Sequence, residues 1–183
     1  MTTFVDHDVT FGRRYEYRVV ALGAGGPSPP SPTIVVRLPR PPTTSAQLTG
    51  VYTVHLTVRE AHALSSALGI EDPTPGESAT DRWTFEPVCA TPLSACPTQW
   101  EGLGGYLVAT GRSWVGTVMG PEARCGNGTK APAPTRFDLR VNDAYGDSDA
   151  WVVGSFEGSV SLSFHCPGFL VSRGSVVVRG IRR

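Results

Sequence analysis

The most constraining feature of this sequence is a segment of alternating apolar and polar residues that ends in a cysteine. Residues 83–89 read WTFEPVC, which places the bulky side chains of Trp83, Phe85 and Pro87 on one side of an extended chain. Such alternation is typical of a strand with one buried face. Cys96 follows across a short polar loop, and a disulfide to it would fasten the end of the strand. A strand fastened in this way favours a secreted β domain.

The composition favours strands and excludes several functional classes. The chain has 183 residues, enough for one medium domain or for one domain with an appendage. Lys and Arg number 16, as do Asp and Glu, so we expect no nucleic-acid partner and no electrostatic hold on a membrane. The 21 glycines and 16 prolines are typical of strands joined by turns. No apolar run approaches the roughly 18 residues of a transmembrane helix, so we expect no membrane span in this chain.

Alternating segments recur in the second part of the chain. The clearest is 50–58, in which Tyr52, Val54, Leu56 and Val58 are predicted to point inward. Further strands are predicted at 82–89, 106–110, 113–118, 135–141, 151–164 (one or two strands) and 175–179. About eight strands with hairpin-sized connections predict an all-β fold, namely an antiparallel β-barrel in up-and-down order. A β-sandwich is the alternative.

Three further features of this part of the chain lead to local predictions. Residues 60–68 are predicted to form one or two helical turns or a loop. Gly116, Gly154 and Gly158 lie inside predicted strands, where glycine is typical of bulges and barrel corners. Residues 39–47 begin with a proline-rich run, which predicts a semi-rigid linker.

The first 38 residues carry a different pattern, with predicted strands at 15–21 and 33–38 around a turn rich in glycine and proline. The positions that stand out are Phe4, Val5, Asp6, Val9, Gly12, Tyr15, Tyr17, Val19, Ala21, Gly26, Ser28 and Ser31. Their order resembles the C-terminal half of a fibronectin type III domain. The resemblance implies the last three strands of that sandwich, with Tyr15 as its corner tyrosine.

Three strands of a two-sheet sandwich cannot cover their own inner face. The apolar side chains that need a partner are Phe4, Tyr17, Val19, Ile34 and Val36. We therefore expect this chain to be cut from a longer protein, and the lack of a secretory signal at its start supports the same expectation. The predicted organisation is a partial fibronectin type III-like segment (1–38), a linker (39–47) and a disulfide-stapled, barrel-like domain (48–183).

A second set of positions spans the larger domain. It consists of Gly50, Tyr52, Val54, Trp83, Phe85, Pro87, Cys89, Cys96, Tyr106, Gly116, Cys125, Phe156, Gly158 and Cys166. Together they resemble a poorly characterised domain of actinobacterial secreted and surface proteins. The resemblance implies a place outside the cell, in some proteins next to kinase or fibronectin modules. It implies no functional residues.

Four cysteines allow three disulfide pairings. A Cys89–Cys96 bond would close a short loop, and a Cys125–Cys166 bond would tie a mid-chain loop to the end of a late strand. The alternative is a zinc site of all four cysteines, with or without His165. Because the sequence lacks any C-x-x-C spacing, we predict two disulfides and an extracellular or cell-surface location.

Three tryptophans are candidates for ligand binding. Trp100, Trp114 and Trp151 could line the mouth of a barrel and stack on a sugar or another flat ligand. The alternative is that they fill the core and cap the ends of the barrel.

A group of acidic residues is the candidate metal site. Asp143, Asp147 and Asp149 lie within residues 142–149, and closely spaced oxygen ligands suit calcium. The segment lacks the glutamate that completes an EF-hand loop. We therefore predict a plain turn between two strands and no bound metal.

No catalytic motif stands out. Ser113 is not part of a G-x-S-x-G turn, and His7, His55, His62 and His165 are scattered, with His55 on the predicted wet face. We predict no catalytic residues and no cofactor. The predicted function is a non-enzymatic extracellular module for adhesion, ligand sensing or surface display, with a glycan or a protein as ligand. The alternative is the accessory carbohydrate-binding region of a secreted glycoside hydrolase.

Overall fold

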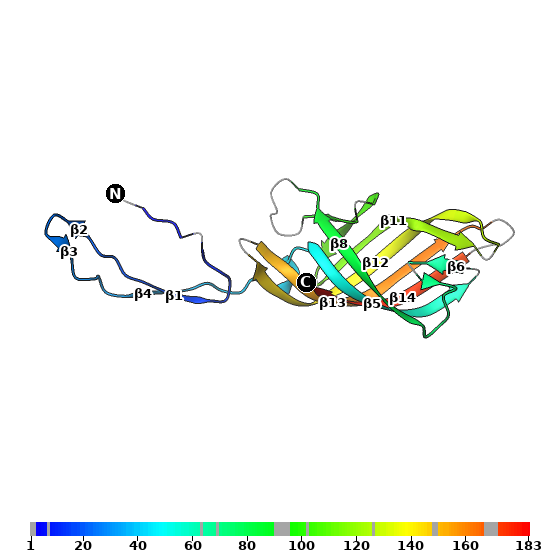
Figure 1. Ribbon diagram of the computed structural model, residues 1–183, viewed down its shortest axis with the longest axis horizontal. Helices are drawn as coiled ribbons and strands as arrows, with labels where there is room; N and C mark the ends of the chain where they lie inside the picture. The colour runs from blue at the N-terminus through cyan, green and yellow to red at the C-terminus, as the bar shows by residue number, and fades with distance from the viewer. Residues whose placement is uncertain are drawn as a thin grey trace.

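The computed structural model describes residues 3–6, 8–62, 64–68, 70–89, 96–101, 103–125, 127–147, 150–166 and 172–183. Strands dominate, and no α-helix occurs among these residues. The N-terminal residues form a long, thin arm, and the rest of the chain forms a larger closed sheet (Figure 1). The prediction of an all-β fold is confirmed.

The larger part is a 10-stranded antiparallel sheet. Its strands are β5 (Gly50–His62), β6 (Leu64–Ala67), β7 (Ile70–Glu71), β8 (Ser78–Pro87), β9 (Thr98–Trp100), β10 (Gly105–Thr110), β11 (Ser113–Cys125), β12 (Lys130–Asp147), β13 (Ala150–Phe164) and β14 (Ser172–Arg182). Their order is β10-β9-β8-β5-β14-β13-β12-β11-β6-β7, and β10 also pairs with β11.

Because β10 pairs with β11, eight strands are hydrogen-bonded in a closed ring. Their order around the ring is β5, β8, β9, β10, β11, β12, β13 and β14. Apart from the β6–β7 hairpin, which extends from β11, every strand of this ring lies beside its neighbours in the sequence. The predicted up-and-down order of about eight antiparallel strands is confirmed. We call this unit the closed sheet.

The inward faces follow the period-two pattern of the sequence. The predicted inward side chains of β5, from Tyr52 to Val58, are all buried, and Phe137, Leu139 and Val141 are buried on β12. Trp83 and Phe85 point inward from β8. These predictions are confirmed, and the strands are longer than predicted, because β5, β11, β12 and β14 continue beyond their alternating segments.

Aromatic rings fill the interior of the closed sheet. The ring of Trp100 lies 5.2 Å from that of Trp83 and 5.0 Å from that of Phe137, measured between centroids. Tyr52 contacts Phe156 at 5.2 Å. An eight-stranded ring leaves an interior just wide enough for side chains to fill. The aromatic cluster therefore serves as the core that joins opposite walls of the closed sheet.

Two glycines allow neighbouring strands to approach closely. A Cβ atom at Gly158 would press on the carbonyl oxygen of Asp138 and lie 2.9 Å from Cα of Leu139, on the adjacent β12. A Cβ atom at Gly116 would meet the backbone of Tyr106 in the same way. These contacts give a steric reason for two of the three glycines, Gly116 and Gly158, for which the sequence predicts bulges or barrel corners.

Both cysteine pairs are joined as disulfides. Cys89 and Cys96 have Cα atoms 6.0 Å apart, and Cys125 and Cys166 have Cα atoms 5.8 Å apart. No cysteine is left to bind zinc, so the zinc alternative is excluded. Cys125 is the last residue of β11 rather than part of a loop, so its bond ties β11 to the chain just after β13. Two disulfides indicate a non-reducing environment.

One local prediction is wrong. Residues 60–62 and 64–67 form strands instead of helical turns or a loop, because β5 runs to His62 and β6 spans Leu64–Ala67. The end of β5 pairs with β14, with His62 opposite Arg173. Cross-strand hydrogen bonds, which local sequence does not reveal, thus override the weak helical preference of this segment.

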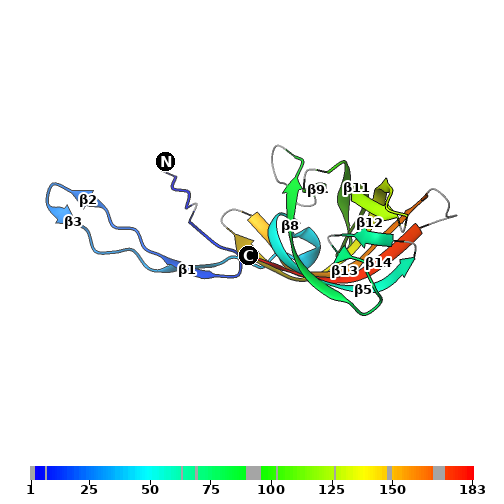
Figure 2. The same ribbon diagram turned by 45° about the vertical axis from the view of Figure 1, so that its right-hand side comes forward.

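The arm consists of residues 3–38, of which residue 7 is not described. Strands β1 (Arg14–Tyr17) and β4 (Ile34–Arg37) pair antiparallel, and β2 (Leu22–Gly23) pairs with β3 (Gly26–Pro27) at the tip. Residues 3–6 lie outside any strand. A 3-10 helix, η1 (Thr43–Ser45), leads into the closed sheet. Figure 2 shows the arm standing away from the closed sheet in a second view.

Serine side chains replace missing ladder bonds in the proline-rich half of the arm. Val19 N–H donates to Ser31 Oγ (3.0 Å), and Ala21 N–H donates to Ser28 Oγ (3.0 Å). The adjacent prolines have no N–H to donate. The hairpin therefore continues past β1 and β4 without a regular ladder.

Replacing Gly158 by alanine is expected to destabilise the closed sheet. The added methyl group must displace the backbone of β12, at a cost of about 1–3 kcal/mol in the free energy of unfolding. Gly104→Ala is the matched control, because nothing lies within 4 Å of a Cβ atom there. Denaturant unfolding followed by tryptophan fluorescence measures both variants, and equal stability of the two would contradict the steric role of Gly158.

Candidate functional site

The residues that follow the arm are inserted into one end of the closed sheet. Gln47 forms a parallel bridge with Val152: its N–H donates to Trp151 O (2.8 Å), and its carbonyl accepts from Val153 N–H (3.0 Å). Its buried side chain makes two bonds to the backbone of Cys96, at 2.9 Å and 3.1 Å. The last residues of the predicted linker are thus buried in the core, and Gln47 connects β13 to the Cys89–Cys96 disulfide.

Trp151 lies where the arm leaves the closed sheet. Its ring meets Phe11 edge to face, with centroids 5.9 Å apart. Its Nε1–H donates to the carbonyl of Pro42 at 3.2 Å. Trp151 is partly buried. Through its contacts with Phe11 and Pro42 it fixes both the arm and the start of η1 to β13.

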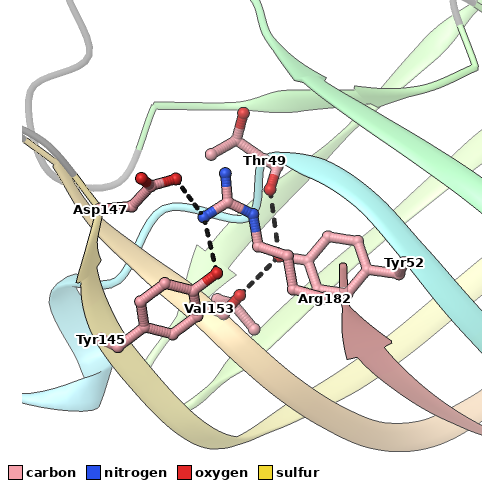
Figure 3. A network of polar contacts seen from close by, with 6 residues as sticks. All are labelled: Thr49, Tyr52, Tyr145, Asp147, Val153 and Arg182. Atoms are coloured by element: carbon pink, nitrogen blue, oxygen red, sulfur yellow. Dashed lines mark hydrogen bonds and ion pairs between the residues drawn. The ribbon is translucent and has the colours of Figure 1, made fainter.

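A polar cluster around Arg182 lies at the same end, where β5 begins and β12 and β14 end (Figure 3). The guanidinium of Arg182 forms an ion pair with Asp147 at 2.7 Å and donates to Tyr145 Oη at 3.1 Å. It also lies 5.6 Å from the centroid of the Tyr145 ring. Only 14% of the Arg182 side chain is exposed. A cation with so little exposure needs such partners, because its desolvation is costly.

Gly50 makes room for this guanidinium. Its φ of +93° lies in the left-handed region that favours glycine, and a Cβ atom there would lie 2.8 Å from Nε of Arg182. That Nε is buried without a hydrogen-bond partner. The backbone conformation therefore requires glycine at position 50, and the lack of a side chain there leaves space for Arg182.

The ionisation of the cluster follows from burial and charge. Burial opposes the charged form of Arg182 most strongly, but the hydrogen bonds to Asp147 and Tyr145 and the charges of Tyr145 and Tyr52 together outweigh it, and the pKa of Arg182 is raised. Burial also raises the pKa of Tyr52 well above its usual value of 10.0. The Tyr52 hydroxyl donates to Val153 O (2.7 Å) and lies 3.2 Å from Thr49 O. Both groups therefore keep one protonation state at physiological pH.

The geometry gives this cluster a structural rather than a chemical role. Arg182 already neutralises Asp147, and the hydroxyl of Tyr52 is committed to backbone carbonyls inside the closed sheet. The cluster fastens the ends of β12 and β14 to the start of β5. It thereby holds the end of the closed sheet that carries the arm.

The tryptophans proposed for ligand binding are mostly inside. Trp100 is 3% exposed and Trp114 is 2% exposed, so neither offers a ring face to a ligand in solution. Their rings belong to the core because β9 and β11 place them on the inward side. Trp151 is the only one of the three that is not buried, and it contacts the arm.

The candidate calcium ligands are not gathered into a site. Asp143 and Asp147 belong to β12 rather than to a turn, and Asp147 is paired with Arg182. Asp149 lies outside the described residues. Within the described part of the chain, no group of three His, Cys, Asp or Glu side chains could hold a metal ion.

The histidines are likewise not assembled into a site. His55 is exposed, as predicted, and its Nδ1 lies 2.9 Å from Thr80 Oγ1. His62 and His165 are exposed on other parts of the closed sheet, and His7 lies outside the described residues.

Sequence analysis missed a pair of carboxylates beside the short strand β9. Burial, and then the negative charge of Asp81, raise the pKa of Glu101. Asp81 accepts hydrogen bonds from Arg82 N–H (2.7 Å) and Trp83 Nε1–H (3.1 Å). Asp81 thus accepts a backbone hydrogen bond on the part of β8 that extends past β9. The pair could not be found without knowing that β9 lies beside β8.

A shallow groove of about 340 Å³ crosses the outer face of the closed sheet. Ser161 and Ser175 lie opposite each other on β13 and β14, and Ser163 lies nearby. At one side, Arg173 forms an ion pair with Glu60 at 2.8 Å. Hydroxyl groups beside an ion pair can donate to and accept from a polar ligand.

No family model matches the chain, and neither a curated protein nor a solved structure is significantly similar to it. Among the described residues, no helix is long and apolar enough to cross a membrane.

Replacing Tyr52 by phenylalanine is expected to change how stability depends on pH. The raised pKa means that the folded state keeps the proton of Tyr52 at a pH at which the unfolded chain loses it. Stability from this source is present below about pH 10 and declines as the pH rises further. Tyr52→Phe should weaken this alkaline decline, and at pH 7 it should cost about 1 kcal/mol for the bond to Val153.

Urea unfolding at pH 7 and pH 11 measures both effects. Tyr106→Phe is the control, since Tyr106 is 52% exposed and should leave both values unchanged. An alkaline decline of the same size in Tyr52→Phe and in the unaltered chain would show that Tyr52 is not its source.

Proposed function

We propose that this chain is a non-enzymatic extracellular module that serves adhesion, ligand sensing or surface display. The closed sheet is its rigid body, and the arm is the spacer through which it joins other parts. Its ligand is a glycan or a protein that contacts the outer surface.

The disulfides carry this proposal. Every cysteine is bonded, and the two bonds hold different parts of the closed sheet: the loop after β8, and the ends of β11 and β13. Such bonds persist in oxidising surroundings and are rare in the cytosol. The aromatic core supports a binding role on the outside, because rings rather than a ligand chamber occupy the centre of the closed sheet.

For residues 1–38 we propose a fibronectin type III-like segment. Its support is the hydroxyl of Tyr15, which accepts from Thr10 N–H at 2.6 Å, five residues upstream. A corner tyrosine bonds to nearby upstream backbone in this manner. The antiparallel pairing of β1 with β4 agrees with the last two strands of such a sandwich. For residues 48–183, the resemblance to actinobacterial secreted and surface proteins remains a prediction.

Antibodies raised against the purified chain test the location. They are expected to label intact cells of the source organism, and the protein recovered from those cells should show no free thiol when it is unfolded without reductant. An antibody against a cytosolic protein is the control for leakage. Labelling only after lysis, together with four reactive thiols, would contradict the proposal.

A carbohydrate-binding role is the second candidate, and the groove at Ser161 and Ser175 favours it. Its hydroxyl groups and its charged pair match the donors and acceptors of a sugar. The buried rings of Trp100 and Trp114 give this candidate no support.

Pull-down on insoluble polysaccharides tests the groove. If it binds sugar, the double change Glu60→Ala with Arg173→Ala should weaken binding roughly tenfold, because it removes hydrogen bonds to charged groups. The control is Glu122→Ala with Lys130→Ala, which removes another exposed ion pair. Absence of binding, or equal loss in both variants, would count against this candidate.

A further inference from the structure

The outer face of the closed sheet carries an exposed aromatic ring at Tyr106. In the described part of the closed sheet, the exposed aromatic side chains are Tyr106, at 52% exposure, and Tyr145. The guanidinium of Arg182 already lies 5.6 Å from the centroid of the Tyr145 ring. Among the described residues, no such cation and no second ring lies against Tyr106. The ring of Tyr106 is therefore available to a ligand.

Polar side chains flank Tyr106 on both neighbouring strands. On β11, Thr117 lies directly opposite Tyr106. On β9, Thr98 lies opposite Leu107, so the next residue, Gln99, falls beside Tyr106. All three side chains point outward, because they alternate with buried neighbours along their strands. We call Gln99, Tyr106 and Thr117 the Tyr106 row, and within the described chain none of the three has a side-chain hydrogen bond.

Close backbone packing positions the ring of Tyr106. A Cβ atom at Gly116 would press on the carbonyl oxygen of Tyr106, and a Cβ atom at Gly105 would lie 2.9 Å from Cα of Val118. The two glycines thus allow β10 and β11 to lie close together at this point. The ring is presented from a tightly packed backbone, which lowers the entropy cost of binding a ligand.

A row of apolar side chains lies next to the Tyr106 row. Val108 lies opposite Val115, and both are on the outer face. Val88 N–H donates to the carbonyl of Pro97, which continues the pairing of β8 with β9 and brings these two residues into the same row. Val88 and Val108 are each 44% exposed. Apolar and hydrogen-bonding groups therefore lie side by side on this face.

We propose that the Tyr106 row binds a neutral polysaccharide, with the ring of Tyr106 stacked on the face of a sugar. The inference rests on the proposed function, in which a glycan or a protein contacts the outer surface. A sugar ring gathers its C–H groups on its faces and carries its hydroxyl groups at its edge. The C–H groups suit the aromatic ring. The amide of Gln99 and the hydroxyl of Thr117 can each donate to and accept from the sugar hydroxyls.

The charges and the size of this surface select the ligand. Glu86 lies opposite Gln99 on β8, and Arg136 lies opposite Thr117 on β12. These charges have opposite signs and flank the Tyr106 row on its two sides, so they favour neither an anionic nor a cationic ligand. A stable protein interface needs about 800 Å² on each partner. One exposed ring and a short apolar row offer only part of that area, whereas a sugar ring covers a single aromatic side chain.

Affinity electrophoresis of the full chain, in gels that contain a soluble polysaccharide, tests this site. The panel consists of mixed-linkage β-glucan, xylan, galactomannan and the anionic polygalacturonate. At least one neutral polysaccharide is expected to retard the chain. Tyr106→Ala should weaken this binding roughly tenfold, because the stacked ring is lost. Tyr106→Phe keeps the ring and should bind like the unaltered chain, and Gln99→Ala should weaken binding roughly fivefold through the loss of a hydrogen bond.

Phe4→Ala is the matched control, because it removes an exposed ring on the arm. Tryptophan fluorescence checks that each variant is folded. The proposal would be overturned by no retardation in any neutral polysaccharide, by retardation in polygalacturonate alone, or by equal binding of Tyr106→Ala and the unaltered chain. An equal loss in Tyr106→Phe or in Phe4→Ala would also overturn it, because the loss would then not report stacking on Tyr106.

The same gels separate this site from the groove at Ser161 and Ser175. If the double change Glu60→Ala with Arg173→Ala abolishes binding and Tyr106→Ala does not, the groove is the sugar site and the assignment to the Tyr106 row fails alone. None of these results bears on the extracellular location, which antibody labelling decides.

Discussion

The pairing of β5 with β14 is the contact on which the rest of the structure depends. It joins the first and last strands of the ring, with Val54 opposite Gly180 and Leu56 opposite Val178. Without it, two long strands would expose their edges, and the aromatic core would be open to water. Closure of the ring also limits the space available to side chains inside it. A Cβ atom at Gly180 would press into the ring of Phe156, so glycine is needed there for the core to fit.

Period-two alternation predicted the inward faces of β5, β8 and β12, because each has one wet face and one buried face. The sequence could not reveal residues whose position depends on closure. Arg182 lies on the inward parity of β14, yet its partner Asp147 is far away in sequence. Register shifts between Val141 and Ala144 bring Ala144 to the buried side, so the alternation of the sequence does not predict where Tyr145 and Asp147 lie. The sequence predicts a linker position for Gln47. Its burial could not be predicted, because its partner Cys96 lies far away in the sequence and comes close only in the folded chain.

The arm and the closed sheet differ in how far they pair their backbone groups and cover their apolar side chains. In the closed sheet, long-range pairing satisfies the backbone, and the core covers the apolar face. The arm has one pair of four-residue strands, and serine side chains complete its ladder. Two strands alone cover no apolar face. The exposure of Phe4, Val19 and Ile34 follows directly, and Trp151 and Phe11 hold this incomplete unit in place at its base.

The two units also protect their strand edges differently. Where β8 extends beyond β9, the carboxylate of Asp81 accepts the N–H of Arg82 and places a negative charge on the edge. An edge charge of this kind discourages pairing with another chain. On the arm, the prolines obstruct one edge, whereas nothing described covers residues 14–20 on the other. Along residues 14–20 the charged side chains alternate in sign, and Arg14 forms an ion pair with Glu16 at 2.7 Å. An exposed charge therefore protects an edge of the closed sheet, whereas prolines protect one edge of the arm.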